Sequence, residues 1–118
     1  MPLTQLLDKI HQHPELVSFE EVMDCIANHY DYTATRFSNG LGDNALINEA
    51  GSNEGSCKIF ALGLLNDLYE AQTLACFGQY YRKDVLGNLG GTDHGNIRNF
   101  MKYGWPGIAF DKSALTPK

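Results

Sequence analysis

Apolar residues recur at helical spacing near the start of the chain. The stripe consists of Leu3, Leu6, Leu7 and Ile10, at positions i, i+3, i+4 and i+7. This spacing places the four side chains on one face of a helix that must end before Pro14. Ser18 and Glu21 have the spacing of a capping box, so we expect a second helix to begin at Phe19 and to pack against the first as a hairpin.

The pattern changes to strand-forming residues after this pair of helices. They occupy 32–38, and Asn39-Gly40 closes the run. A polar stretch rich in glycine then covers 40–56, interrupted by the apolar pair Leu46-Ile47. Because long connections in compact domains are usually functional or mobile, we expect this loop to carry function.

A segment that is apolar nearly all round, residues 59–68, predicts a buried central helix. A further helix is predicted over 70–86, followed by a turn at 87–91. Gly63 and Gly78 lower the helix propensity of these two segments. We interpret them as a facing pair that lets the two helices approach closely.

The last part of the chain predicts a helix that begins at Thr92-Asp93 and a short strand at 108–110. Strands near 32–38 and 107–111 are expected to pair into a small sheet against the helices. The elements together predict an α+β fold. It is a helix-rich single domain over 1–118, with about five helices and a small sheet of two or three short strands.

Length and charge exclude several classes of protein. The chain has 118 residues, 43% of them hydrophobic, which is enough for a single core without metal or disulfide. No apolar run approaches the roughly 20 residues of a membrane span. Nine basic and 14 acidic residues give a formal charge of −5, which argues against a dedicated nucleic-acid-binding protein. We therefore expect neither nucleic acid nor a membrane as a partner, and a monomer or weak homodimer.

A modest basic cluster is conceivable near the C-terminal half of the chain. Its members would be Arg82, Lys83, Arg98 and Lys102. Because acidic residues lie among them, we favour a surface that binds acidic groups of a protein partner, or nothing.

The cysteines and histidines indicate a protein of a reducing compartment without metal. Cys25, Cys57 and Cys76 are odd in number and widely spaced, which is a poor disulfide framework. The histidines lack metal-ligand spacing, so neither a metal nor another cofactor is expected. The N-terminal residues enter the helical pattern without a signal peptide, and a cytoplasmic location is expected.

The densest polar feature, residues 48–58, leads into the central helix. Glycine and small polar residues before a buried helix expose its first main-chain amides, which can bind an anion. The phosphate-loop pattern G-x-x-x-x-G-K-[ST] is absent. Ser56 or Asn53 would cap this helix, and a capped start without a ligand remains an alternative.

Cys57 and His94 form a candidate catalytic pair. A thiol in the first turn of a helix and next to Lys58 should have a lowered pKa. If the two predicted helix starts meet, Cys57, His94 and Asp93 could be the nucleophile, base and orienting acid of a hydrolase or transferase. The alternatives are a buried, inert cysteine, and a Thr92 or Asp93 that caps the second helix.

The leading hypothesis is a non-enzymatic binding module. Its recognition surface would combine the 40–56 loop with the 92–98 helix start, and its partner would be a small ligand or a protein. The side chains expected at this surface are Glu49, Asn53, Glu54, Ser56, Lys58, His94, Asn96 and Arg98. A buried ion pair between Glu54 and Arg98 would make these two residues structural instead.

Four motifs carry a resemblance to a known family. They are Asn48-Glu49-Ala50-Gly51-Ser52-Asn53-Glu54-Gly55-Ser56-Cys57-Lys58, Cys76-Phe77-Gly78-x-Tyr80-Tyr81-Arg82, Gly91-Thr92-Asp93-His94-x-Asn96-Ile97-Arg98 and Gly104-Trp105-x-Gly107-Ile108. From about Leu3 to Phe110 the chain resembles the HopJ type III effector protein family. The resemblance implies a bacterial protein that a type III secretion system delivers into a host cell. It implies no reaction and no catalytic residues, because no enzymatic activity is established for that family.

Overall fold

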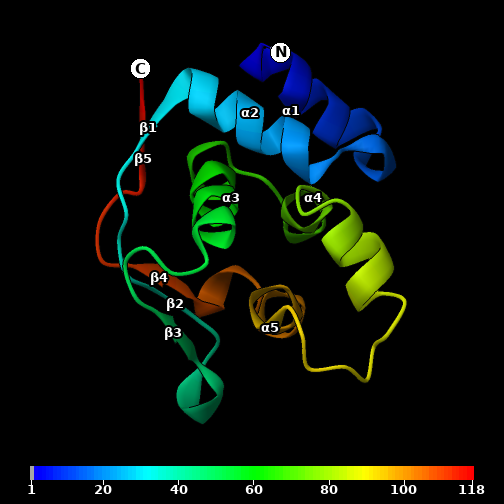
Figure 1. Cartoon of the computed structure of the whole chain (residues 1–118), viewed down its shortest axis with the longest axis vertical. Coiled ribbons are helices and arrows are strands. Elements are labelled where there is room, and N and C mark those ends of the chain that lie inside the picture. Colours follow the sequence, from blue (N-terminus) through cyan, green and yellow to red (C-terminus); the bar gives the residue numbers. More distant parts are fainter. Residues whose placement is uncertain (1) are drawn as a thin grey trace.

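The computed structural model describes residues 2–118, and within them five α-helices combine with five short strands (Figure 1). The helices are α1 (Leu3–Gln12), α2 (Phe19–His29), α3 (Glu54–Leu65), α4 (Glu70–Ala75) and α5 (Gly95–Tyr103). The strands are β1 (Tyr30–Tyr32), β2 (Phe37–Asn39), β3 (Leu46–Asn48), β4 (Ile108–Phe110) and β5 (Leu115–Pro117). A π-helical segment covers Tyr80–Val85, and 3-10 turns cover Pro14–Leu16, Gly42–Asn44 and Trp105–Gly107. The predicted α+β class is confirmed.

The second helix, α2, begins at Phe19, where its capping pattern predicts. Ser18 Oγ accepts a hydrogen bond from Glu21 N at 3.1 Å, and Ser18 N donates to Glu21 Oε2 at 2.8 Å. Lys9 Nζ lies 2.9 Å from Glu21 Oε1 and so links α1 to α2. Burial raises the pKa of Glu21, but the bonds from Lys9 and Ser18 outweigh it, and the pKa lies below its ordinary value.

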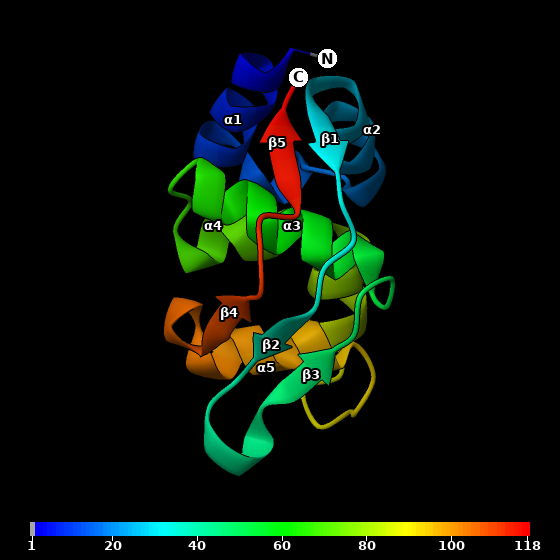
Figure 2. The same ribbon diagram turned by 90° about the vertical axis from the view of Figure 1, so that its left-hand side faces the viewer.

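Two segments far apart in the sequence form one antiparallel ribbon (Figure 2). β1 pairs with β5, and β2 pairs with β4. Between these pairs, Thr33 N donates to Ala114 O at 2.8 Å and Asp111 N donates to Arg36 O at 3.0 Å. The register is therefore continuous from 30–39 to 108–117. The predicted pairing of the two strands is confirmed, but the single predicted strand over 32–38 is wrong, because strand pairing is interrupted between β1 and β2, which belong to two different sheets.

The polar stretch 40–56 is more ordered than its sequence indicates. Its apolar pair belongs to β3, which pairs antiparallel with the free edge of β2. The order of this sheet is β3-β2-β4, and α5 packs against it. The stretch therefore contains the turn and the second strand of a β-hairpin, and this strand, β3, forms one edge of the sheet.

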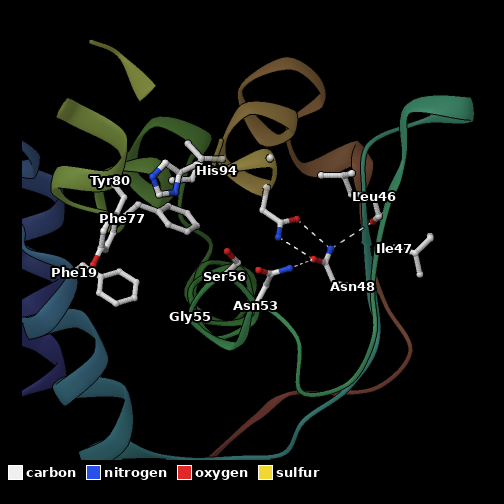
Figure 3. A pocket seen from close by; sticks show the side chains of 13 residues that line it. Phe19, Leu46, Ile47, Asn48, Asn53, Gly55, Ser56, Phe77, Tyr80 and His94 are labelled. Atoms are coloured by element: carbon white, nitrogen blue, oxygen red, sulfur yellow. Dashed lines mark hydrogen bonds between the residues drawn. The ribbon is translucent and has the colours of Figure 1, made fainter. Parts of the chain in front are cut away.

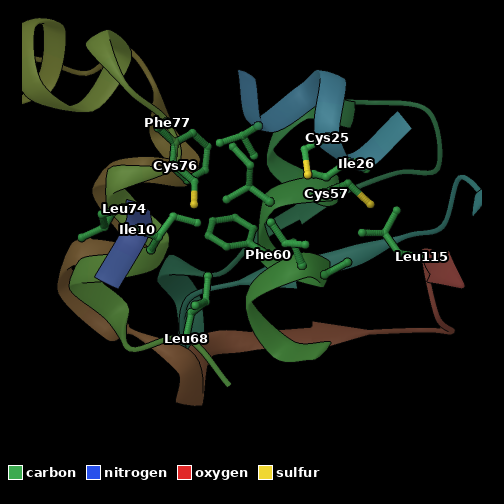
Figure 4. Close-up of a cluster of buried hydrophobic side chains, with 14 of the residues drawn as sticks. Ile10, Cys25, Ile26, Cys57, Phe60, Leu68, Leu74, Cys76, Phe77 and Leu115 are labelled. Carbon is green, nitrogen blue, oxygen red and sulfur yellow. The ribbon is translucent and has the colours of Figure 1, made fainter. Parts of the chain in front are cut away.

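Phe60 of α3 lies at the centre of the hydrophobic core (Figure 4). Its ring centroid is 6.0 Å from that of Phe37, 5.6 Å from Phe77, 4.9 Å from Phe100 and 6.4 Å from Trp105. These rings come from β2, from α5 and from the turns that follow α4 and α5. The prediction that 59–68 forms a buried central helix is confirmed for 59–63, whereas Leu64 and Leu65 at the end of α3 are about half exposed.

The helix predicted over 70–86 is interrupted. α4 ends at Ala75, and Gly78 then takes a left-handed conformation with φ of +60°. A Cβ at Gly78 would lie 2.7 Å from the main-chain nitrogen of Phe19, whereas a Cβ at Gly63 would meet the Trp105 ring at 2.7 Å. Both glycines permit a close approach, but the prediction that they face each other is wrong.

The core continues beyond the last predicted strand. Ala114 and Leu115 are each only 2% exposed, and β5 closes on β1 beside α1 and α2 (Figure 2). In both views the C-terminus ends beside β1, and Lys118 N donates to the main-chain oxygen of His29 at the end of α2 at 3.1 Å. Within residues 2–118, no helix has the length and apolar character needed to cross a membrane.

Candidate functional site

The first turns of α3 and α5 meet at one cavity of about 560 Å³ (Figure 3). Residues from β3 and α2 and from the turn after α4 complete its walls. The lining residues are Phe19, Leu46, Ile47, Asn48, Asn53, Gly55, Ser56, Phe77, Tyr80, His94, Gly95, Asn96 and Ile97. The two helix starts that the sequence singles out are therefore brought together in space.

Both helices begin after a residue in the left-handed conformation. Asn53 has φ and ψ of 52° and 50°, and His94 has 52° and 51°. Neither side chain caps its helix, and the first intrahelical hydrogen bonds are donated by Cys57 N and Arg98 N. The predicted caps at both helices are wrong, and α5 begins three residues later than predicted, at Gly95. The main-chain N–H groups of both first turns are thus left without intrahelical acceptors.

Three asparagines form one wall of the cavity, which we call the amide wall: Asn48, Asn53 and Asn96. Asn48 Oδ1 accepts from Asn53 Nδ2 at 2.8 Å and from Asn96 Nδ2 at 2.9 Å. Asn96 Oδ1 accepts from Asn48 Nδ2 and from Asn39 Nδ2, both at 3.1 Å. This network joins β2, β3 and α5 to the residue that precedes α3, and it fixes the shape of the wall.

Four rings form the opposite wall, which we call the ring wall: Phe19, Phe77, Tyr80 and His94 (Figure 3). The Tyr80 ring lies 5.1 Å from that of Phe19, edge to face, and 5.5 Å from the imidazole of His94. His94 Nε2 lies 3.0 Å from Asp84 Oδ2. The left-handed Gly78 turns the chain so that the π-helical segment brings both Tyr80 and Asp84 to α5, and such segments occur frequently at functional sites.

Half of the predicted binding residues line the cavity, and half do not. Asn53, Ser56, His94 and Asn96 are at the cavity, whereas Glu49, Glu54, Lys58 and Arg98 are not. Arg36 Nε lies 3.4 Å from the exposed Glu49 carboxylate. Lys58 Nζ lies 4.7 Å from the centre of the Tyr32 ring.

Arg98 has a structural partner, but it is not the one considered from the sequence. Its Nη2 lies 2.6 Å from Asp93 Oδ1, and its Nε donates to Asp93 O at 2.6 Å. An ion pair with Glu54 is therefore not formed. Asp93 is exposed, and the hydrogen bond from Arg98 lowers the pKa of its carboxyl group.

The two arginines of the basic cluster considered from the sequence make hydrogen bonds within this chain. Arg82 donates to the carbonyl groups of Pro14, Ala75 and Val17, and Arg98 holds the loop before α5. Lys102 Nζ lies 5.2 Å from the centre of the Tyr103 ring. The arginines therefore stabilise loops of this chain.

The structure does not place Cys57 at the cavity with His94. Cys57 is 1% exposed and belongs to the buried cluster of Figure 4. Burial raises the pKa of its thiol, and the nearby Tyr32 hydroxyl and Thr35 main chain offset this effect only in part. The predicted lowering of the Cys57 pKa is therefore wrong, because the thiol points into the core and not towards the cavity.

The other titratable groups give no metal centre. Within residues 2–118, no three side chains of His, Cys, Asp or Glu are close enough to hold a metal ion. All three cysteines are buried, and none of them forms a disulfide within the described part of the chain.

The sequence reasoning missed three residues of the ring wall, Phe19, Phe77 and Tyr80, and two network residues. Phe19 and Phe77 have the pattern of core residues, and only the fold shows that they line a cavity. The register of β2 and β3 places Asn39 opposite Leu46 and Asn48 opposite Phe37, and both asparagines bond to Asn96. The alternation of Phe37, Ser38 and Asn39 is the one signal that places Asn39 on the inner face.

Comparison with known proteins identifies the relatives of this chain. The model of the family described as HopJ type III effector protein matches residues 3–115. A solved structure described as that of the unknown function protein VPA0580 is 52% identical, with a TM-score of 0.95. That alignment covers 100% of this chain and 95% of the other. No curated protein shows significant similarity.

Proposed function

This chain belongs to the HopJ type III effector protein family, and from that premise we propose that it is a non-enzymatic module that binds a small ligand in the cavity between α3 and α5. Membership of this family implies delivery into a host cell by a type III secretion system. Binding in the cavity would then take place in that cell.

The observation that carries this proposal is the composition of the cavity. About 560 Å³ lies within the usual range of small-molecule sites. Aromatic rings form one wall and hydrogen-bonding amides the other. In small-molecule sites, aromatic and apolar side chains usually provide most of the contact area, and a few polar groups fix the orientation of the ligand. The amides are held by one another, so the polar wall exists before any ligand arrives.

The alternative, a hydrolase or transferase that uses Cys57 and His94, has less support. It requires a thiolate in contact with the imidazole. Cys57 is buried with a raised pKa, and His94 is instead bonded to Asp84. We therefore prefer binding to cysteine-dependent catalysis.

A library of chemically diverse fragments, each added to the ¹⁵N-labelled full chain, tests the proposal. We expect the amide resonances that shift in heteronuclear NMR spectra to cluster at Gly55, Ser56, Gly95 and Asn96. The second hollow of the surface, near Leu64 and Ala114, serves as an internal control. Fragments that shift resonances only there, or nowhere, would refute the cavity as the binding site.

A further inference from the structure

We propose that the cavity takes a small aromatic carboxylate, with its ring against the ring wall and its carboxylate towards the amide wall. This inference rests on the proposed function and adds the chemical class of the ligand. It is carried by three observations: the rings on one side, the hydrogen-bonding groups left over on the other, and the absence of charged side chains at the wall.

The ring wall suits a planar group. Phe19 and Tyr80 already meet edge to face, with an interplanar angle of 83°, and the imidazole of His94 lies beside Tyr80. Aromatic pairs in edge-to-face or offset geometry gain free energy beyond that of the apolar area they bury. A ring placed between Phe19, Phe77 and Tyr80 can therefore make several of these contacts at once (Figure 3).

Two of the three side-chain oxygens of the amide wall, those of Asn48 and Asn96, already accept hydrogen bonds from other asparagines. Both lone pairs of Asn48 Oδ1 are used by Asn53 and Asn96, and Asn96 Oδ1 accepts from Asn39 and Asn48. The carbonyl oxygens of Asn48 and Asn96 are thus unavailable to a ligand. One oxygen of this wall, Asn53 Oδ1, makes no hydrogen bond within residues 2–118.

What remains at this end of the cavity is mostly donors. Asn96 Nδ2 has one N–H to spare, and the Ser56 hydroxyl makes no hydrogen bond within residues 2–118. The main-chain N–H groups of Gly55, Ser56 and Gly95 also lack intrahelical acceptors. The matching end of a ligand must therefore accept hydrogen bonds.

The charge of the side chains that line the cavity indicates which hydrogen-bond-accepting group of a ligand fits there. Among the lining residues of the described chain there is no Asp, Glu, Lys or Arg, so a carboxylate meets no like charge in contact with it. A phosphate, which usually carries more charge and is commonly bound by Arg or Lys, lacks that partner here. A cationic group would find few acceptors here, namely Asn53 Oδ1 and the Ser56 hydroxyl. A singly charged carboxylate fits this wall best.

Titration of the full chain with four matched compounds tests this ligand class. Phenylacetate carries both features, cyclohexylacetate lacks the aromatic ring, phenylacetamide lacks the charge, and acetate lacks the hydrophobic group. We expect phenylacetate to shift the amide resonances of Gly55, Ser56 and Gly95 with a Kd of about 1 mM or below, which is typical of a compound of this size. Cyclohexylacetate and phenylacetamide should each bind about tenfold more weakly, and acetate should cause no saturable shift.

Tyr80→Leu, with Tyr69→Leu as its control, separates the ring wall from general packing. Tyr69 is 76% exposed and lies outside the cavity. Tyr80→Leu should remove the preference for phenylacetate over cyclohexylacetate, and Tyr69→Leu should keep it.

Equal affinities for phenylacetate and phenylacetamide would overturn the inferred carboxylate, and equal affinities for phenylacetate and cyclohexylacetate would overturn the inferred ring. Cavity resonances that respond to fragments of other classes but not to phenylacetate would overturn this inference and leave the proposed function standing. Absence of any response at the cavity would overturn both. Phenyl phosphate that binds more tightly than phenylacetate would replace the carboxylate by a phosphate.

Discussion

Asn96 lies at the centre of the hydrogen-bond network of the candidate site. It joins Asn39 of β2 to Asn48 of β3 through three side-chain hydrogen bonds, and it is 8% exposed. Buried amides are stable only as long as their partners are present, because an unsatisfied buried amide keeps its full desolvation cost. The asparagines are therefore part of the fold as well as of the cavity wall.

Asn96→Ala should lower the free energy of unfolding by about 2 to 3 kcal/mol, since it removes three hydrogen bonds made by the buried amides of Asn39 and Asn48. Asn88→Ala, at an exposed position of the loop before α5, should change it by less than about 0.5 kcal/mol. Urea denaturation of both variants measures the difference. Equal midpoints for the two variants would show that the network does not contribute to stability.

The three cysteines give a second test at the scale of single residues. All are buried, and burial raises the pKa of each thiol, of Cys76 to about 12. Because the thiolate is the reactive form, the native protein should resist iodoacetamide at neutral pH, and all three thiols should react after unfolding in urea. Selective labelling of Cys57 in the native protein would contradict the buried position and restore the catalytic alternative.

At the scale of elements, the turn at Gly78 decides how the ring wall is assembled. The sequence around it has a continuous helical pattern, and a single glycine inside such a pattern is often tolerated. The helix ends there because the main chain of Phe19 packs against Gly78, a contact that only the tertiary structure supplies. The pattern therefore predicts a helical segment correctly but cannot predict its interruption.

Gly78→Ala should lower the free energy of unfolding by about 2 kcal/mol or more, because alanine is disfavoured at a φ of +60° and its Cβ would lie 2.7 Å from Phe19 N. Gly90→Ala has open space around its Cβ and no positive φ, so its effect should stay within about 0.5 kcal/mol. Thermal unfolding followed by circular dichroism compares the two. A Gly78→Ala variant as stable as Gly90→Ala would disprove the close approach of this turn to α2.

The two helix starts at the cavity show what sequence reasoning could and could not reach. Glycine and polar residues before Cys57 and around His94 correctly mark both starts as candidate sites, since such residues break regular structure and expose main-chain groups. Which other residues lie beside these two helix starts depends on contacts between residues far apart in the sequence. Asn48 joins the site through strand register, and Lys58 leaves it because its position on α3 turns its side chain towards Tyr32.

At the scale of the whole molecule, the C-terminal strand closes the fold by pairing with β1 and packing against α3. Continuous register between 30–39 and 108–117 makes the last residues part of the core. No hydrophobic pattern announces this, because the segment after Phe110 is short and polar apart from Ala114 and Leu115. Burial of those two residues follows from the pairing of the strands and not from their own sequence.

Leu115→Ala should lower the free energy of unfolding by about 2 to 4 kcal/mol, as expected for a leucine that is 2% exposed. Leu89→Ala, at a position that is 69% exposed, is the matched control and should have little effect. Urea denaturation at constant pH measures both. A small effect at Leu115 would show that the C-terminal strand is not part of the cooperative fold.

The central claim is that the cavity between α3 and α5 is a binding site, and filling it tests this claim most directly. Ser56→Trp places an indole ring in the cavity from the first turn of α3, and Ser52→Trp places one at an exposed position of the preceding loop. Fragments that shift the cavity resonances of the unmodified chain should bind Ser56→Trp at least about tenfold more weakly and Ser52→Trp unchanged, with both variants folded. Unchanged fragment binding by a folded Ser56→Trp variant would contradict the account.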